Sequence, residues 1–149
     1  MRLSVPILKL PEAEDLPLPS YATELSAGVD LYAAVPGVVS IAPQKRAVIP
    51  TGIAVALPPD CEAQIRSRSG LAAKSGVFVL NSPGTVDADY RGEIKVILHN
   101  AGDTTFLVKR GMRIAQMIIA PVLHVQWRPV AALPGTERGK NGFGSTGVY

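Results

Sequence analysis

Residues 81–92 of the chain read Asn81-Ser82-Pro83-Gly84-Thr85-Val86-Asp87-Ala88-Asp89-Tyr90-Arg91-Gly92. This stretch holds an amide, a turn signal, two carboxylates, a phenol and a guanidinium. An apolar run at 77–80 precedes it, and an alternating stretch at 93–98 follows it. Apolar runs on both sides of a Pro-Gly turn signal predict a β-hairpin. A rigid hairpin with polar side chains at its base is suited to a ligand pocket.

The rest of the chain predicts an almost entirely β domain. Its 13 prolines and 14 glycines interrupt it every few residues, and no stretch keeps the apolar spacing of an amphipathic helix over three turns. Many short strands of this kind form barrels or sandwiches. In the stretch that begins at Glu93, residues Ile94, Val96 and Leu98 share one face, as in a half-buried strand. We expect strands at 3–9, 28–33, 37–41, 46–57, 62–67, 77–80, 93–100, 105–108 and 113–126.

One short helix is expected at 70–74. Ser69 is placed to cap its start and Gly76 to end it. Two turns at most are too few to form the core, but the first amides of such a helix can face an anion, beside Arg68.

Length and composition predict a single soluble domain. The chain has 149 residues, of which 47% are hydrophobic and 18% charged, which excludes a disordered protein. No apolar run approaches the ~18 residues of a membrane span, and the N-terminus lacks a secretory pattern. Cys61 is the one cysteine, so no intrachain disulfide is expected, and we predict an inert thiol in a reducing, cytoplasmic compartment.

The charge pattern favours a small polyanion as the ligand. The 15 basic residues against 12 acidic ones give a net charge of +3, and aromatic residues make up 5%. The arginines stand singly inside polar motifs instead of clustering, so we expect neither nucleic acid nor a membrane surface as a partner.

Two carboxylates are candidates for chemistry. Asp30 lies inside the apolar stretch Ala27-Gly28-Val29-Asp30-Leu31-Tyr32-Ala33, where burial is costly unless an arginine pairs with it, and that pairing is the favoured interpretation. Asp87 could hold and deprotonate an attacking water near a phosphoryl group. Alternatively, Asp87 and Asp89 simply serve a turn.

Two further blocks carry polar groups on or beside predicted strands. Guanidinium, hydroxyl and amide groups that could meet a phosphate converge in Arg66-Ser67-Arg68-Ser69-Gly70-Leu71-Ala72. In Arg110-Gly111-Met112-Arg113-Ile114-Ala115-Gln116-Met117, Gly111 predicts a turn, so Arg113 and Gln116 should begin the next strand. The Gln116 amide then needs a partner, and a structural role is the commoner one.

The C-terminal block is rich in glycine. Residues 142–147 match the spacing of a dinucleotide fingerprint, but no helix can follow, and Lys140 precedes Asn141 where a phosphate-binding loop needs Ser or Thr. Arg138 and Phe143 among glycines favour an arm that closes over a ligand. We expect a domain at 1–136 and a flexible arm at 137–149.

Taken together and in this order, the five blocks resemble those of the trimeric dUTPases. The resemblance runs from about residue 27 to 147 and implies a jelly-roll-like β-barrel (the β-clip fold) in a homotrimer with active sites shared between subunits. It implies hydrolysis of dUTP to dUMP and pyrophosphate, with Mg²⁺ on the triphosphate. This reaction keeps uracil out of DNA and supplies dUMP for thymidylate synthesis.

The resemblance also implies roles for single residues. Asp87 is the general base, and Asp30 reaches the metal through water. Tyr90 packs under the deoxyribose, and Phe143 stacks on the uracil. The remaining residues implied to bind the substrate are Arg68, Ser69, Gly70, Asn81, Gly84, Thr85, Val86, Lys95, Gln116, Arg138, Gly144, Ser145 and Thr146. His99 and His124 are expected in separate strands with structural roles.

Two rival functions remain. A dCTP deaminase shares this fold, but it would lack the Phe143 arm and would need a carboxylate beside the cytosine amine. A non-catalytic β-sandwich module would bind a ligand with the same polar strips and without turnover.

Overall fold

The structure is a computed structural model, and it describes residues 3–142. Within that range the chain is almost entirely β, as predicted, with a single α-helix and a single 3-10 helix. The elements are β1 (Ile7–Lys9), η1 (Pro11–Ala13), β2 (Val29–Tyr32), β3 (Val39–Ile41), β4 (Arg46–Pro50), β5 (Ile53–Val55), β6 (Cys61–Arg66), α1 (Ser69–Ser75), β7 (Val77–Val79), β8 (Gly84–Val86), β9 (Lys95–Asn100), β10 (Phe106–Val108) and β11 (Arg113–Pro121).

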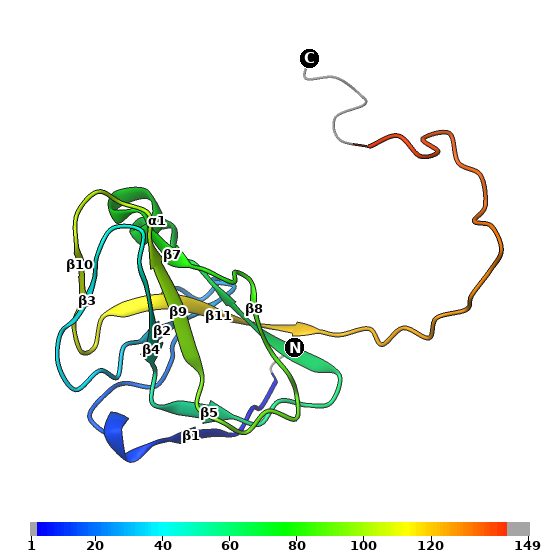
Figure 1. The fold of residues 1–149 in the computed structure, drawn as a ribbon. Helices are drawn as coiled ribbons and strands as arrows, with labels where there is room; N and C mark the ends of the chain where they lie inside the picture. Colours follow the sequence, from blue (N-terminus) through cyan, green and yellow to red (C-terminus); the bar gives the residue numbers. More distant parts are fainter. Residues whose placement is uncertain (1–2, 143–149) are drawn as a thin grey trace.

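The strands form antiparallel sheets that wrap around one core (Figure 1). The largest sheet has the order β2-β11-β6-β8, and a second has the order β4-β9-β7. The pairs β1-β5 and β10-β3 complete the body. Most neighbours are distant in sequence, so the fold depends on long-range pairing.

The core follows the alternation expected in β9. Ile94, Val96 and Leu98 are buried, whereas Lys95 between them is exposed. Each strand from β2 to β11 contributes to the same apolar cluster. Its members in strand order include Leu31, Ile41, Ile49, Val55, Ile65, Val79, Val86, Leu98, Val108 and Ile114.

One long predicted strand is in fact two. The stretch expected at 46–57 divides into β4 and β5 at Thr51 and Gly52. Gly52 has φ +66°, and a Cβ there would lie 2.1 Å from the Cβ of Ala13. The close approach of η1 therefore requires a glycine in a left-handed turn, and the sequence around residue 50 carries no sign of that neighbour.

The helix lies where it was predicted, but the predicted N-cap residue is wrong. α1 begins at Ser69, its N-cap is Arg68, and no side chain caps it. Gly76 ends it in the left-handed conformation at φ +65°, as predicted. The hydroxyl of Ser67 instead accepts a hydrogen bond from the amide of Val79, at 2.9 Å, and so ties the helix approach to β7.

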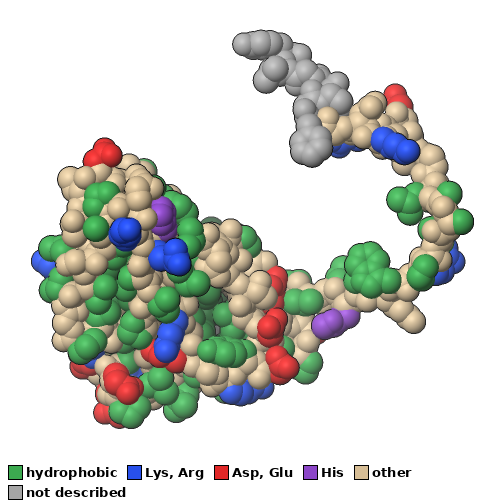
Figure 2. Space-filling view, in the orientation of Figure 1, with side chains coloured by type: hydrophobic (Ala, Val, Ile, Leu, Met, Phe, Trp, Pro, Cys, Tyr) green, Lys and Arg blue, Asp and Glu red, His purple; other side chains and the backbone are tan. Residues whose placement is uncertain are grey.

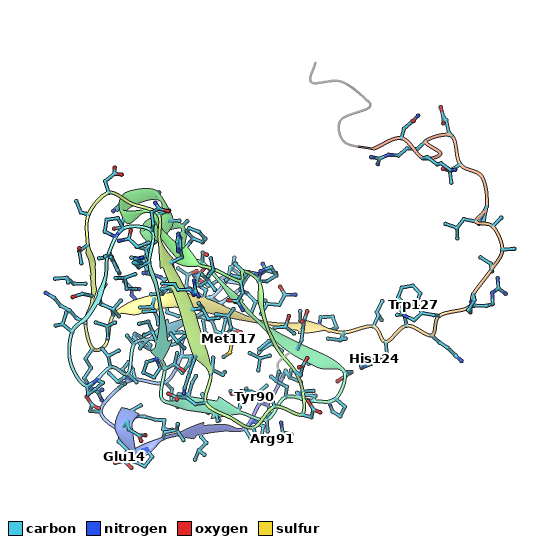
Figure 3. The ribbon with its side chains drawn as sticks, viewed as in Figure 1. Glu14, Tyr90, Arg91, Met117, His124 and Trp127 are labelled. Atoms are coloured by element: carbon cyan, nitrogen blue, oxygen red, sulfur yellow. The ribbon has the colours of Figure 1, made fainter. Side chains whose placement is uncertain are left out.

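The last strand ends earlier than expected. β11 begins at Arg113, as predicted, but stops at Pro121 instead of 126. Beyond the bond from the Val122 amide to the Asp60 carbonyl, the chain leaves the body as an extended segment (Figure 1). His124, expected in a strand, lies on this segment together with Trp127, which is 84% exposed (Figure 3).

The Cys61 thiol is half-buried and free. Desolvation raises its pKa, and the charge of the adjacent Asp60 raises it further, which agrees with an inert thiol.

His99 packs edge-on against Phe78, with ring centroids 5.4 Å apart, consistent with its expected structural role. Between residues 3 and 142, no helix is long and apolar enough to cross a membrane.

An ion pair fastens the N-terminal turn to the body. The guanidinium of Arg110 donates to both carboxylate oxygens of Asp15 and to the Glu12 carbonyl. The hydrogen bond from Arg110 is the main cause that lowers the pKa of Asp15 below its ordinary value of 3.8. A carboxylate whose pKa is depressed by folding stabilises the fold above its ordinary pKa, and this contribution is lost as pH falls through the folded pKa.

We therefore expect Asp15→Asn to be less stable than the parent chain near neutral pH and to approach it below about pH 3.8. Urea unfolding at a series of pH values measures the difference. Asp103→Asn, at an exposed carboxylate in no ion pair of the described residues, is the control. A difference at Asp15 that stays constant down to pH 2 would contradict the assigned role.

Candidate active site

The predicted hairpin exists, but its loop is long. β7 and β9 pair antiparallel, with Val79 opposite Leu98, so the strands on either side of residues 80–94 are hairpin partners. Within the loop, β8 was not predicted, and it pairs with β6, placing Gly84 opposite Ile65. The loop is thus held by two sheets, which makes its base rigid.

A pocket of about 290 Å³ opens between this loop and β9. It contains seven of the residues predicted to bind substrate or to catalyse. Its lining comprises Val48, Ile65, Val79, Asn81, Gly84, Thr85, Val86, Asp87, Tyr90, Glu93, Ile94, Lys95, Val96 and Ile97. The site therefore lies between the loop and β9, with Val48 of β4 and Ile65 of β6 in its wall.

Asn81 and Gly84 approach each other closely in this pocket. A Cβ at Gly84 would lie 3.1 Å from Nδ2 of Asn81 and 3.4 Å from Cβ of Ile65. Glycine therefore lets the amide side chain lie against the backbone of β8. The wall of the pocket therefore carries both side-chain and main-chain hydrogen-bonding groups.

Asp87 lies directly after β8 at the mouth of the pocket. Its carbonyl accepts a hydrogen bond from the amide of Tyr90 at 3.1 Å, so the backbone makes the turn that was the alternative explanation for Asp87. Its carboxylate is exposed and accepts no hydrogen bond from the described residues. The turn is therefore made without the side chain, which remains available to a water or a ligand.

Asp30 is the centre of an arginine cluster on another part of the sheet. Its side chain is only 7% exposed, and its two oxygens each accept from a guanidinium at 3.1 Å, one of Arg68 and one of Arg113. Arg68 also donates to the carbonyl of Arg113. The expectation that an arginine pairs with this buried carboxylate is confirmed.

We expect Asp30→Asn to lower the free energy of unfolding by about 2 kcal/mol, because an uncharged amide keeps only one acceptor oxygen and turns its NH₂ group toward the other guanidinium in a mostly buried place. Urea unfolding measures this loss, and Asp103→Asn serves as the exposed control. A loss no larger than the control's would mean that the cluster adds nothing to stability.

The other phosphate candidates lie near Asp30. Gln116 on β11 is opposite Asp30 on β2 and Arg66 on β6, and it is half-buried. Ser69 and Gly70 begin α1, directly after Arg68. This group of residues, Arg68, Ser69, Gly70 and Gln116, contributes nothing to the lining of the pocket.

Glu93 lines the pocket, although it was not predicted as a site residue. Its Oε1 accepts from the amide of Gly52 at 2.9 Å, and its carbonyl accepts from the hydroxyl of Tyr90 at 3.0 Å. A signal was present in the sequence, since Glu93 is an acidic residue at the start of the alternating stretch at 93–98. Its partner Gly52, however, is distant in sequence.

Arg138 is exposed, and its guanidinium donates to the carbonyl of Asn141. Phe143, Gly144, Ser145 and Thr146 lie outside the described residues.

The carboxylate of Asp30 fits a metal ion that is held through water. Among residues 3–142, no three His, Cys, Asp or Glu side chains gather to hold an ion. Mg²⁺ commonly keeps several waters and binds through phosphates plus one or two carboxylates. Each oxygen of Asp30 accepts one guanidinium bond, which leaves lone pairs for a metal-bound water.

Comparisons with known proteins identify the family of the chain. A family model described as dUTPase matches residues 14–147. The deoxyuridine 5'-triphosphate nucleotidohydrolase of Anaplasma marginale (strain St. Maries) is 56% identical over 98% of this chain and 99% of its own length. Its counterpart in Ehrlichia canis (strain Jake) is 57% identical over 97% of this chain and 95% of its own.

A solved structure extends the comparison to the fold. The dUTPase of Staphylococcus bacteriophage 80alpha, solved with dUPNHPP, superposes with a TM-score of 0.87 at 26% identity, covering 97% of this chain and 99% of that one. The jelly-roll-like β fold expected from the resemblance is thereby confirmed. The chain belongs to the dUTPase family.

Proposed function

We propose that the chain hydrolyses dUTP to dUMP and pyrophosphate, with Asp87 as general base. Water attacks the α-phosphorus, Asp87 takes its proton, and the bond from the α-phosphorus to the bridging oxygen breaks as pyrophosphate leaves. The observation that carries the proposal is the exposed Asp87 carboxylate at the mouth of a nucleoside-sized pocket, with no partner among the described residues.

The pocket accepts the uracil and the sugar. The amide of Asn81 and the backbone of β8, from Gly84 to Val86, read the edges of the base, and the close fit of these groups around the uracil excludes a 5-methyl group. Tyr90 packs under the deoxyribose. Thr85 and Lys95 line the same pocket and complete the contacts around the nucleoside.

The phosphates meet Arg68, Ser69, Gly70 and Gln116, and these come from another subunit. The proposal is supported by the separation of these residues from the pocket lining within one chain. A homotrimer that brings the pocket of one subunit to the arginine cluster of the next completes each site. Charge neutralisation there and in-line positioning supply much of the catalysis.

The arm at 137–149 reaches the site from a neighbouring subunit, through the extended segment that precedes it. Leu123, Val125, Trp127 and Leu133 are exposed. Figure 2 shows hydrophobic side chains along the extended segment. Residues 123–142 are all exposed among the residues that the structure describes, and a run of apolar side chains on such a segment suits a neighbouring subunit. Through it, Arg138, Ser145 and Thr146 bind the γ-phosphate end, with Gly144 close to the substrate and Phe143 on the uracil.

Mg²⁺, when bound to the triphosphate oxygens, neutralises charge on the phosphates and makes the α-phosphorus more electrophilic. Asp30 would hold it through water. In the cell the reaction would keep uracil out of DNA and supply dUMP for thymidylate synthesis, in the cytoplasm.

A substrate screen tests the function. We expect pyrophosphate release from dUTP with Mg²⁺, and rates for the other deoxy- and ribonucleoside triphosphates lower by about a hundredfold or more. Ammonia release from dCTP would instead identify a deaminase. Tight binding of dUTP without release of pyrophosphate would identify a binding module.

A further inference from the structure

We propose that Gly92 and Glu93 form a seat that fixes the ring of Tyr90, and that this seat sets the selectivity for a deoxyribose over a ribose. The inference rests on the proposed function, in which Tyr90 packs under the sugar. Gly92 and Glu93 are positioning residues here, since both act through Tyr90.

The ring of Tyr90 needs such a seat because little else holds it. Tyr90 is 46% exposed, and it lies in a loop at the rim of the body (Figure 3). Its hydroxyl donates to the carbonyl of Glu93 at 3.0 Å. Because donor and acceptor are only three residues apart, the side chain folds back over Gly92, one of the two residues between them.

Gly92 leaves the space that the ring occupies. A Cβ at Gly92 would lie 2.4 Å from Oη, 2.6 Å from Cζ and 3.0 Å from Cε2 of Tyr90. All three of the nearest atoms belong to that ring, and Gly92 is not among the glycines with positive φ. An alanine is therefore compatible with the backbone, and the group that must move is the Tyr90 ring.

Glu93 is held in turn, so the acceptor for Tyr90 has a fixed place. Its Oε1 accepts from the amide of Gly52, and its Oε2 lies 3.5 Å from Nζ of Lys95. The next residue, Ile94, donates its amide to the Ile53 carbonyl, and its own carbonyl accepts from Thr51. The seat is thus anchored in the junction between β4 and β5.

The consequence for the substrate follows from the size of the displacement. Ordinary contact with a Cβ begins at 3.4 Å, so the hydroxyl end of the ring must shift by about 1 Å in Gly92→Ala, and a misplacement of this size can cost up to about a hundredfold in rate. Selectivity against a single hydroxyl group depends on close fit. A displaced ring loses that fit for dUTP, whereas UTP, already poorly fitted, has less to lose.

The test measures kcat and KM for dUTP and UTP in the full-length protein. In Gly92→Ala, we expect kcat/KM for dUTP to fall about tenfold or more and its ratio to that for UTP to fall with it. Gly37→Ala is the matched control, because a Cβ at Gly37 meets nothing within 4 Å. Thermal unfolding of both variants should match that of the parent chain.

A double-mutant cycle shows whether the effect passes through the ring. In a Tyr90→Ala background, Gly92→Ala should have no further effect on either substrate. Tyr90→Phe, which keeps the ring but loses the bond to Glu93, should lower the selectivity in the same direction. If the parent chain selects dUTP and Gly92→Ala has the same selectivity, the seat is overturned while the proposed function stands. If the parent chain is inert toward dUTP, the proposed function itself fails.

Discussion

Replacing Asp87 with asparagine should lower kcat for dUTP by about 10²–10⁴-fold while leaving nucleotide binding nearly intact, because an amide cannot take the proton of the attacking water. The structure makes this a clean substitution. The Asp87 side chain is exposed and accepts no hydrogen bond from the described residues, and the turn at 87–90 is closed by its backbone carbonyl. Single-turnover kinetics with dUTP and titration with a non-hydrolysable analogue separate the two effects.

Asp89→Asn is the matched control for that experiment. Asp89 is an exposed carboxylate two residues away in the same loop, and it does not line the pocket, so its loss changes the local charge equally without removing the base. We expect its kcat to remain within about threefold of the parent value. Parental turnover in Asp87→Asn, or an equal loss in both variants, would remove Asp87 from its proposed role.

The sequence predicted those parts of the fold that depend on local patterns. Alternation at 94–98 placed β9 with the correct face inward, and Gly76 marked the end of α1. β8 was missed because Gly84–Val86 becomes a strand only by pairing with β6, about twenty residues earlier in the chain. The break at Gly52 was missed for the same reason, since its cause is Ala13 in a distant turn.

In the site, too, local patterns predicted some features and distant contacts determine the others. The residue types that could contact a nucleotide were identified from their motifs, and seven of them line one pocket. Which carbonyl receives the hydroxyl of Tyr90, and which arginines share Asp30, are set by contacts across loops and sheets. Arg113 was predicted only as the beginning of a strand. The pairing of β11 with β2 is what brings it beside Asp30.

Deleting residues 137–149 should lower turnover by about a hundredfold or more, since it removes the groups proposed to bind the γ-phosphate and cover the base. Stability should barely change. Among the described residues, the hydrogen bonds of residues 137–142 stay within 136–142, such as Arg138 to Asn141 and Gly139 to Thr136. The melting temperature should therefore move by less than about 3 °C.

The matched control for this deletion is removal of Val148 and Tyr149 alone, which lie beyond the last glycine of the motif. This shorter variant should keep the parental turnover if the motif at 138–147 is what acts on the substrate. Measuring kcat, KM and thermal unfolding for both truncations distinguishes an arm that serves catalysis from one that holds subunits together. A long deletion that lowered turnover and melting temperature together, with dissociation of the oligomer, would assign the arm to assembly, because a group needed only for closure has no reason to support the unliganded fold.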